Sequence, residues 1–171
     1  MKIKAYVSKL VVFFLIFFIP SLVMPEAKLI IGRVEKVCVS PGNIVFRAKM
    51  DTGAKTSSLD CDAISVFDKD GVKWVRFTTI NHKGKNVTLE RKIHRISKIK
   101  RGSGIIQERI VVMLDLCLGN IKKETEVNLN DRADFIYRML VGRSFMGGSI
   151  IVDPSLKYTT EPECRRTKGC E

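Results

Sequence analysis

The chain of 171 residues has few of the side chains that bind transition metals. His82 and His94 are its only histidines and no Cys-x-x-Cys pair occurs, so a zinc site built by the protein is hard to assemble. Internal repeats and low-complexity linkers are also absent. At this length we expect one domain with a core of its own.

The cysteines are an odd number, five, which excludes a framework in which all of them pair within one chain. Cys164 and Cys170 flank a short segment of the tail, and we expect a disulfide between them if the compartment is oxidising. Cys38 and Cys117 lie in apolar, strand-like runs and are expected to be small core residues.

No apolar run is long enough for an ordinary membrane-spanning helix. The run over residues 10–24 falls short of the roughly 20 residues that such a helix needs, and it follows a lysine-containing start without acidic residues. This pattern is typical of a secretory signal. We expect residues 1–27 to be a signal peptide, with the mature chain beginning near Lys28 and exported to the periplasm. If the segment is not cleaved, it anchors the protein in the inner membrane, facing the periplasm.

Acidic residues are outnumbered, with 18 Asp and Glu against 30 Lys and Arg. Removal of residues 1–27 takes three Lys and one Glu, which leaves 27 minus 17, a net charge of +10. Such a field favours acidic partners. The cations are spread over residues 83–101 and 122–123 without interleaved aromatic residues, which favours a charged surface and argues against nucleic acid as the partner.

The rest of the chain alternates short apolar runs with turn residues and predicts an all-β fold. Hairpin turns are predicted at residues 68–71, 81–85 and 119–120. Ile93, Ile96 and Ile99 recur at helical spacing, but their β-branched side chains favour an extended segment.

The C-terminal third predicts two more strands around a helical turn. Residues 135–141 and 150–152 have strand character, and Ser144–Met146 predicts one turn of helix between them. The tail, residues 159–171, is expected to be irregular and exposed.

One acidic residue stands at the end of a predicted strand over residues 44–50. Asp51 is followed by Thr52 and Gly53, a pattern that turns the backbone sharply while it points a carboxylate into a cleft. Taken alone, the tripeptide is equally typical of an ordinary turn.

Three segments together resemble the retroviral-type aspartic proteases, in order and rough spacing: Asp51-Thr52-Gly53-Ala54, the glycine-rich Arg101-Gly102-Ser103-Gly104 and Leu140-Val141-Gly142-Arg143. In detail the chain resembles a bacterial retropepsin-like family often labelled ATP-dependent zinc protease. The matching segments are residues 49–59, 109–118 and 140–158, within an expected domain over residues 28–158. The zinc in that label has no support in this sequence.

The resemblance implies a closed acid-protease barrel, with no cofactor and no metal, in which each chain supplies one Asp-Thr-Gly loop. No second such tripeptide occurs, so we expect a homodimer in which Asp51 meets its symmetry mate. Two close carboxylates share a proton, so one can act as general base on water while the other acts as general acid.

The resemblance also implies roles for the other matching residues. Asp51, Thr52 and Gly53 form the catalytic loop, with Thr52 bonding across the dimer, and Ala54 and Lys55 lie beside the substrate. Arg101, Gly102, Ser103 and Gly104 form the tip of a flap over the substrate, the alternative being a flexible surface hairpin. Leu140, Val141, Gly142 and Arg143 support the catalytic loop from behind. The hairpins over residues 61–90 are then an insertion.

Lys55 departs from the viral pattern, which places an acidic residue there for the arginine after the later glycine. Arg143 therefore needs another partner, with Asp60 or Asp62 as candidates, or it faces the substrate. Lys55 and Arg143 make the cleft basic, which suits an acidic peptide. Cytosolic relatives sit beside glutamate-ligase systems, which points to glutamate-rich substrates, whereas the signal segment argues against the same substrate here.

The sequence thus predicts an exported, homodimeric, retropepsin-like aspartic endopeptidase. A barrel of the same fold that binds peptide or envelope components without catalysis is the alternative, and a metal-dependent hydrolase is a third. Membrane association is expected only if residues 1–27 are retained.

Overall fold

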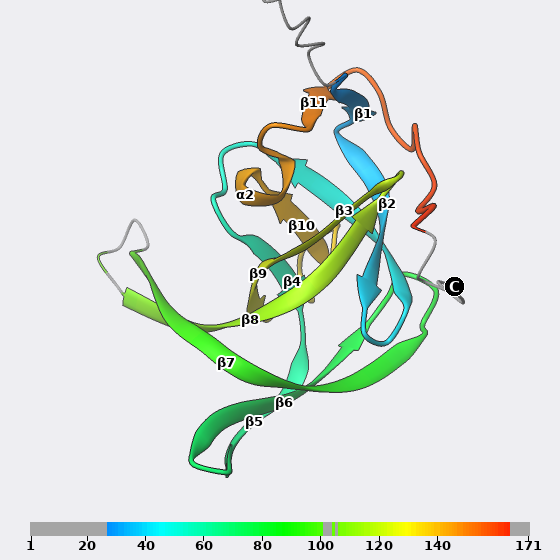
Figure 1. The fold of residues 1–171 in the computed structure, drawn as a ribbon. Helices are drawn as coiled ribbons and strands as arrows, with labels where there is room; N and C mark the ends of the chain where they lie inside the picture. The colour runs from blue at the N-terminus through cyan, green and yellow to red at the C-terminus, as the bar shows by residue number, and fades with distance from the viewer. Residues whose placement is uncertain (1–26, 101–103, 105, 165–171) are drawn as a thin grey trace, which may run out of the picture.

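The structure, a computed structural model, describes residues 27–100, 104 and 106–164 (Figure 1). Its elements are β1 (Leu29–Gly32), β2 (Val34–Ser40), β3 (Ile44–Asp51), β4 (Ser57–Asp60), β5 (Asp62–Lys69), β6 (Val72–Ile80), β7 (Asn86–Lys100), β8 (Ile106–Leu118), β9 (Ile121–Asn130), β10 (Met139–Gly142), α2 (Arg143–Met146) and β11 (Ile150–Asp153). Within the described residues no helix is long and apolar enough to cross a membrane.

Six strands close into a barrel. They pair in the order β2, β3, β10, β4, β9 and β8, and β8 pairs with β2 to complete the ring. The β3–β10 and β4–β9 pairs are parallel, and the others are antiparallel. This arrangement, with the short helix α2 near the C-terminus, confirms the predicted all-β, closed, retropepsin-like barrel.

Alternation along β3 sets which side chains face the barrel interior. Ile44, Phe46, Ala48 and Met50 are buried in the core, so the odd-numbered side chains lie on the outer face. Asp51 belongs to this second set. The candidate site therefore lies on the outside of the barrel, at the end of β3.

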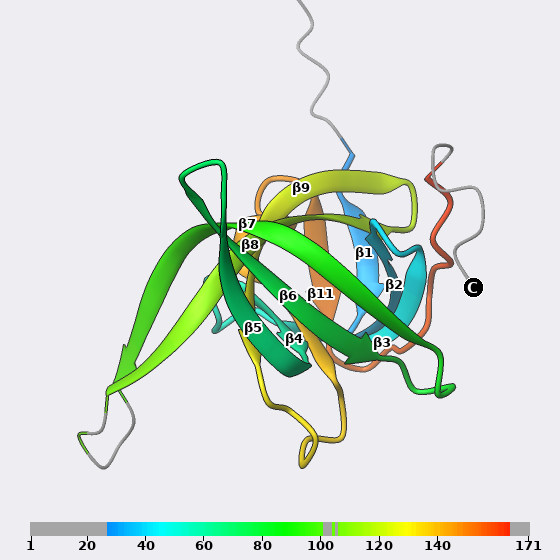
Figure 2. The same ribbon diagram turned by 90° about the horizontal axis from the view of Figure 1, so that it is seen from below.

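The strand β7 extends the sheet beyond the barrel. Its first half pairs with β6 and its second half pairs with β8, and β6 in turn pairs with β5 at the edge of the sheet. Figures 1 and 2 show this ribbon crossing below the barrel. The predicted hairpin turns at 68–71, 81–85 and 119–120 are all present, and Ile93, Ile96 and Ile99 are in extended structure, as predicted.

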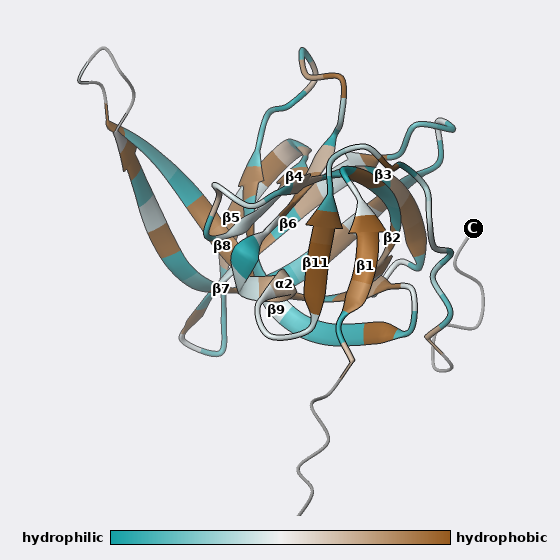
Figure 3. Cartoon of the chain, turned by 90° about the horizontal axis from the view of Figure 1, so that it is seen from above, coloured by the Kyte–Doolittle hydropathy of each residue, from teal (hydrophilic) through white to brown (hydrophobic). Residues whose placement is uncertain are grey.

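A separate parallel pair of strands, β1 and β11, lies beside the barrel and is largely apolar (Figure 3). The chain after β11 then runs back along β2. Glu35 on β2 is fully buried and accepts hydrogen bonds from Gly32, Thr159 and Thr160, and Lys36 forms an ion pair with Glu161. Residues 159–164 form no helix or strand, but these contacts attach them to the barrel.

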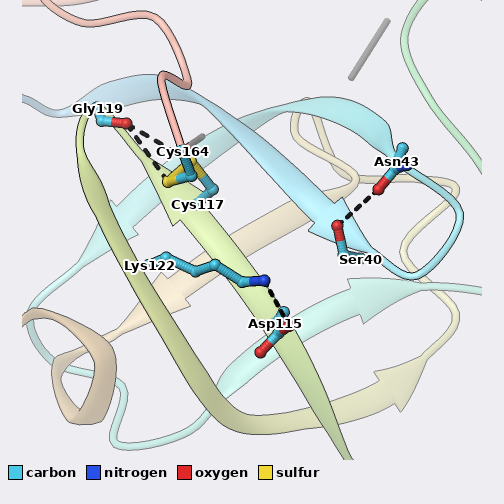
Figure 4. Close-up of a disulfide and its surroundings, with 7 residues drawn as sticks. All are labelled: Ser40, Asn43, Asp115, Cys117, Gly119, Lys122 and Cys164. Carbon is cyan, nitrogen blue, oxygen red and sulfur yellow. Dashed lines mark hydrogen bonds and ion pairs between the residues drawn. A yellow bond between two sulfur atoms is a disulfide. The ribbon is translucent and has the colours of Figure 1, made fainter. Parts of the chain in front are cut away.

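The expected disulfide between Cys164 and Cys170 is wrong, because Cys164 is bonded to Cys117 on β8 (Figure 4). The backbone N–H of Glu163 donates to the carbonyl of Gly119, which brings the tail to the end of β8. Cys38 and Cys117 are buried, as predicted, but both are disulfide-bonded rather than simple core residues.

The strand predicted over residues 135–141 begins only at Met139. The segment before it forms a loop, residues 131–138, because the N–H of Phe135 turns back to the carbonyl of Arg132 and the Arg132 guanidinium donates to the carbonyl of Tyr137. We call this segment the β9–β10 loop.

Candidate active site

The carboxylate of Asp51 is held by its own loop. Its Oδ1 accepts the N–H groups of Gly53 at 3.1 Å and Ala54 at 3.2 Å, which fixes the turn after β3. Its Oδ2 accepts no hydrogen bond from the loop and lies 3.6 Å from the Nζ of Lys49. The side chain is 27% exposed, so a reactant can approach the carboxylate.

The strand β10 supports this loop from behind. Its register sets Leu140 beside Lys49, Val141 beside Met50 and Gly142 beside Asp51. The N–H of Arg143 then donates to the carbonyl of Ala54 at 2.8 Å. The loop is therefore tied into the sheet.

Gly142 is needed for this close approach. A Cβ at this position would lie 2.6 Å from the carbonyl oxygen of Lys55, which real Cβ atoms do not tolerate. The Gly142 N–H also donates to the Oγ of Ser57 on the neighbouring strand. Any larger residue would push the loop away from β10.

Arg143 has a different partner from those predicted. Its Nη1 donates to the carbonyl of Gly53 at 2.7 Å, so it stabilises the loop through backbone and not through a carboxylate. Asp60 is instead bound by the guanidinium of Arg138 and by the backbone N–H of Arg132, because the register of β4 and β10 brings Arg138 to it. Asp62 is exposed at the start of β5.

Thr52, Gly53 and Lys55 are exposed on the single chain, and Ala54 is half-buried. These residues border Asp51 on the side away from the barrel core. Thr52, Gly53 and Ala54 present a surface of backbone and small side chains that a second chain or a peptide can contact closely.

The glycine-rich segment between β7 and β8 falls mostly outside the described residues, since Arg101, Gly102 and Ser103 are not described. Gly104 is exposed and has a positive φ of 79°. The two strands that carry the segment, β7 and β8, extend from the same side of the barrel as the β9–β10 loop (Figures 2 and 3). Arg95 on β7 links this hairpin to the site, because its Nη2 donates to Thr56 at 3.3 Å.

Several polar residues that were not predicted from the sequence lie on the outer face near Asp51. Asn128 on β9 contacts Ser58 at 2.9 Å and Arg109 at 3.4 Å, and Arg132 lies close to Arg109. Burial lowers the pKa of the Arg132 guanidinium, and the Arg109 cation lowers it further. The alternation of polar and apolar residues along β9 was the available signal.

Arg95 and Glu126 form a polar pair beside the Asp51 loop. Arg95 donates two hydrogen bonds to Glu126, and this contact raises the pKa of Arg95 and lowers the pKa of Glu126. His94 lies 3.3 Å from the same carboxylate. The pair belongs to β7 and β9, so it joins the base of the hairpin to the barrel.

Neither a metal cluster nor a reactive thiol is found near Asp51 in the part of the chain that is described. No three side chains of His, Cys, Asp or Glu gather as a metal ion requires, within residues 27–100, 104 and 106–164. Cys61 has a free thiol, but burial raises its pKa to about 12. Among the described residues, the candidate reactive group at this site is thus the Asp51 carboxylate.

A closed six-stranded barrel that carries Asp-Thr-Gly at one strand end, supported by Leu-Val-Gly-Arg on the neighbouring strand, is the arrangement of a retropepsin-like aspartic protease domain. A family model described as the retropepsin-like aspartic endopeptidase RimB matches residues 30–163. The chain therefore belongs to the RimB-like family.

Similar proteins are found among curated sequences and solved structures. Probable alpha-L-glutamate ligases of Shewanella halifaxensis and Parasynechococcus marenigrum are 36% and 33% identical over 79% and 74% of this chain. The chain spans only about 30% of the length of these relatives. A Legionella pneumophila protein of unknown function, with a solved structure, is 34% identical, with a TM-score of 0.67 over 79% of this chain and 100% of its own.

Proposed function

We propose that this protein is an exported aspartic endopeptidase whose active site forms when two chains pair. The observation that carries the proposal is Asp51 itself: one oxygen is fixed by its loop and the other accepts no N–H of that loop, in a chain that has a single Asp-Thr-Gly. One carboxylate supplies half of the acid and base groups that peptide hydrolysis needs. A second copy supplies the other half.

In the proposed mechanism the two Asp51 carboxylates share one proton. The ionised carboxylate removes a proton from water, which attacks the peptide carbonyl, while the protonated one donates to the carbonyl oxygen. The carboxyl that took the proton from water then gives it to the nitrogen and the C–N bond breaks, while a hydroxyl of the tetrahedral intermediate returns a proton to the other carboxylate. The protonation states belong to the pair and not to either residue.

The roles of the neighbouring residues follow from their contacts. Gly142 and Arg143 hold the Asp51 loop against β10, and exposed Thr52 and Gly53 would bond to the partner chain. Leu140 and Val141 fill the space behind the Asp51 loop. The hairpin of β7 and β8, including Arg101–Gly104, would close over the bound peptide and exclude water.

The charge of the outer face supports an acidic peptide as substrate. Lys49 and Lys55 lie on the same side as Asp51 or border its loop, and Arg132 lies close enough to interact with the charge of Asp51. Arg95 and Arg138 are neutralised by Glu126 and Asp60. Positive groups thus outnumber negative ones around the site, which favours acidic side chains on the substrate.

Export is supported by two observations that are independent of the site. Residues 1–27 have the pattern of a signal peptide or an N-terminal anchor. The Cys117–Cys164 disulfide is the kind of bond that persists in an oxidising compartment such as the periplasm.

One observation favours the alternative of a barrel that binds peptide without cleaving it. The ammonium of Lys49 lies 3.6 Å from the Oδ2 of Asp51, where the water or the partner carboxylate would have to lie. Catalysis requires that Lys49 moves away from this oxygen when the dimer forms.

A peptide-library digest, analysed by mass spectrometry at several pH values, tests the proposal. The wild-type protein is expected to cut peptides, and Asp51→Asn is expected to lose about 10³-fold in rate without loss of folding. Asp70→Asn, at the exposed β5–β6 turn, is the matched control and should cut normally. Cleavage that survives Asp51→Asn would overturn the proposal, and loss of cleavage with a chelator would point to the metal-dependent alternative.

A further inference from the structure

A cavity of about 420 Å³ opens on the outer face of the barrel. It lies between β3, the β6–β7 turn, the β9–β10 loop and the start of the tail. We call it the Arg47 pocket. Its lining residues are Phe46, Arg47, His82, Ala133, Phe135, Ile136, Tyr137, Arg138 and Tyr158.

Strand register connects the Arg47 pocket to Asp51. On the parallel pair β3–β10, Asp51 lies beside Gly142 and Lys49 lies beside Leu140. The next residues on the same face are Arg47 and Arg138, since side chains alternate along a strand. At about 3.3 Å per residue, Arg47 lies about 13 Å from Asp51 along β3.

The pocket combines aromatic rings with uncompensated positive charge. The guanidinium of Arg47 lies 5.8 Å from the ring centre of Tyr158, and no carboxylate of the described residues lies within ion-pair distance of it. Arg138 is oriented by its ion pair with buried Asp60. Burial, followed by the charge of Arg47, lowers the pKa of His82, so His82 adds little charge at neutral pH.

Two further features distinguish the lining of the Arg47 pocket from an ordinary surface. Phe135 is 55% exposed and Ile136 is 91% exposed, so the loop presents large apolar side chains to solvent. Tyr158 has a positive φ of 54°, which is uncommon for a bulky residue, and its N–H is held by the carbonyl of Val34. Backbone strain of this kind is often found where a side chain is aimed at a ligand.

We infer that the Arg47 pocket is a substrate subsite, which binds an aromatic side chain of a peptide together with a neighbouring carboxylate. The ring would pack against Phe135 and Tyr158, and the carboxylate would pair with Arg47. The bound residue lies about four positions from the cleaved bond, since an extended peptide covers about 3.3 Å per residue. This inference rests on the proposed function, and a symmetric dimer places one such pocket on each side of the cut.

The binding experiment uses proteins that all carry Asp51→Asn, so that cleavage plays no part. The probes are N-acetyl-Phe-Glu-amide and N-acetyl-Ala-Glu-amide, titrated by NMR. The phenylalanine probe is expected to bind about fivefold more tightly. Phe135→Ser should remove this preference, whereas Arg47→Ala should weaken the binding of both probes, because both carry the carboxylate. Arg76→Ala is the matched control, because Arg76 lies over the Phe67 ring at 5.6 Å on β6, away from the pocket. Equal affinity for the two probes, a preference that survives Phe135→Ser, or unchanged binding of both probes to Arg47→Ala overturns the subsite.

The cleavage experiment then tests whether the pocket contributes to substrate specificity. Cut sites of the wild-type protein in a peptide library should be enriched in aromatic residues about four positions from the cut, and Phe135→Ser should lose this enrichment. Cleavage without enrichment overturns the subsite and leaves the proposed function standing. Absence of any cleavage by the wild-type protein, with the probe preference present, would contradict the proposed function and with it the substrate role of the pocket.

Discussion

Glu35 and Asp51 are carboxylates on adjacent strands of the barrel, and each accepts backbone N–H groups from a nearby loop. Around Glu35, both oxygens are occupied: Oε1 accepts bonds from Gly32 and from the N–H and hydroxyl of Thr159, and Oε2 accepts the N–H of Thr160. Around Asp51, only Oδ1 is occupied by backbone, and Oδ2 lies beside a single lysine.

This difference separates a structural carboxylate from the one that we propose to be catalytic. Glu35 is fully buried and connects the tail to the barrel, so its hydrogen bonds contribute to the stability of the fold. Asp51 is partly exposed, and its loop is stabilised by backbone contacts from Gly142 and Arg143 that leave one oxygen without a backbone donor. Changes around Glu35 should therefore affect stability, and changes around Asp51 should affect activity.

The largest effect is expected from Glu35→Ala. Removal of the carboxylate leaves one buried and three partly buried donors without this acceptor, and the free energy of unfolding should fall by about 4 kcal/mol in a urea titration. The rate per folded molecule should stay near that of the wild type. Glu161→Ala is the control, because its exposed ion pair with Lys36 should change stability by less than about 1 kcal/mol. Lost cleavage in a fully stable Glu35→Ala protein would contradict the comparison.

The next effect concerns the disulfide that closes the same region. The double variant Cys117→Ser and Cys164→Ser should lose about 3 kcal/mol of stability, because it frees a loop of chain between β8 and the tail. Peptide cleavage below the melting temperature should persist. If cleavage disappears while calorimetry shows an unchanged melting temperature, the tail acts on the site and not on the fold.

On the Asp51 side, Gly142→Ala tests the contact with β10. The added methyl group would displace Lys55 and with it the loop, and we expect the cleavage rate to fall by about 100-fold. Gly53→Ala is the control for folding, since its Cβ would lie 3.4 Å from the Oδ1 of Asp51, an ordinary contact, and thermal melting should be little changed. A Gly142→Ala protein with normal activity would show that the loop is held by other contacts.

The smallest effect is a pH dependence at the base of the β7–β8 hairpin. Arg95 lowers the pKa of Glu126 in the folded protein, so the ionised pair adds stability above the ordinary pKa of 4.5, and this stability is lost as the pH falls below it. The contribution should be less than about 1 kcal/mol, because the pair is partly exposed. Melting curves at pH 6 and pH 3 should differ less for Glu126→Gln than for the wild type. An equal difference for both proteins would assign the acid sensitivity to other groups.

Local patterns predicted much of this structure, and long-range contacts account for what they missed. Turn residues located the hairpins, and the resemblance to retroviral-type aspartic proteases implied that residues 140–143, the strand β10 and the residue after it, would lie behind the Asp51 loop. Cys117 and Cys164 are 47 residues apart, and only the return of the tail along β2 brings them together. Likewise, Arg143 takes a backbone carbonyl and not a carboxylate, which no sequence spacing indicates.

The central claim is that one site requires Asp51 from two chains, and subunit mixing tests it most directly. Wild-type and Asp51→Asn proteins are mixed in equal amounts at constant total concentration, allowed to exchange subunits, and assayed for peptide cleavage. If the dyad is shared, mixed dimers are inactive and about one quarter of the wild-type rate remains. A remaining rate of about one half, with exchange verified by native mass spectrometry, would mean that each chain holds a complete site and would contradict the shared dyad.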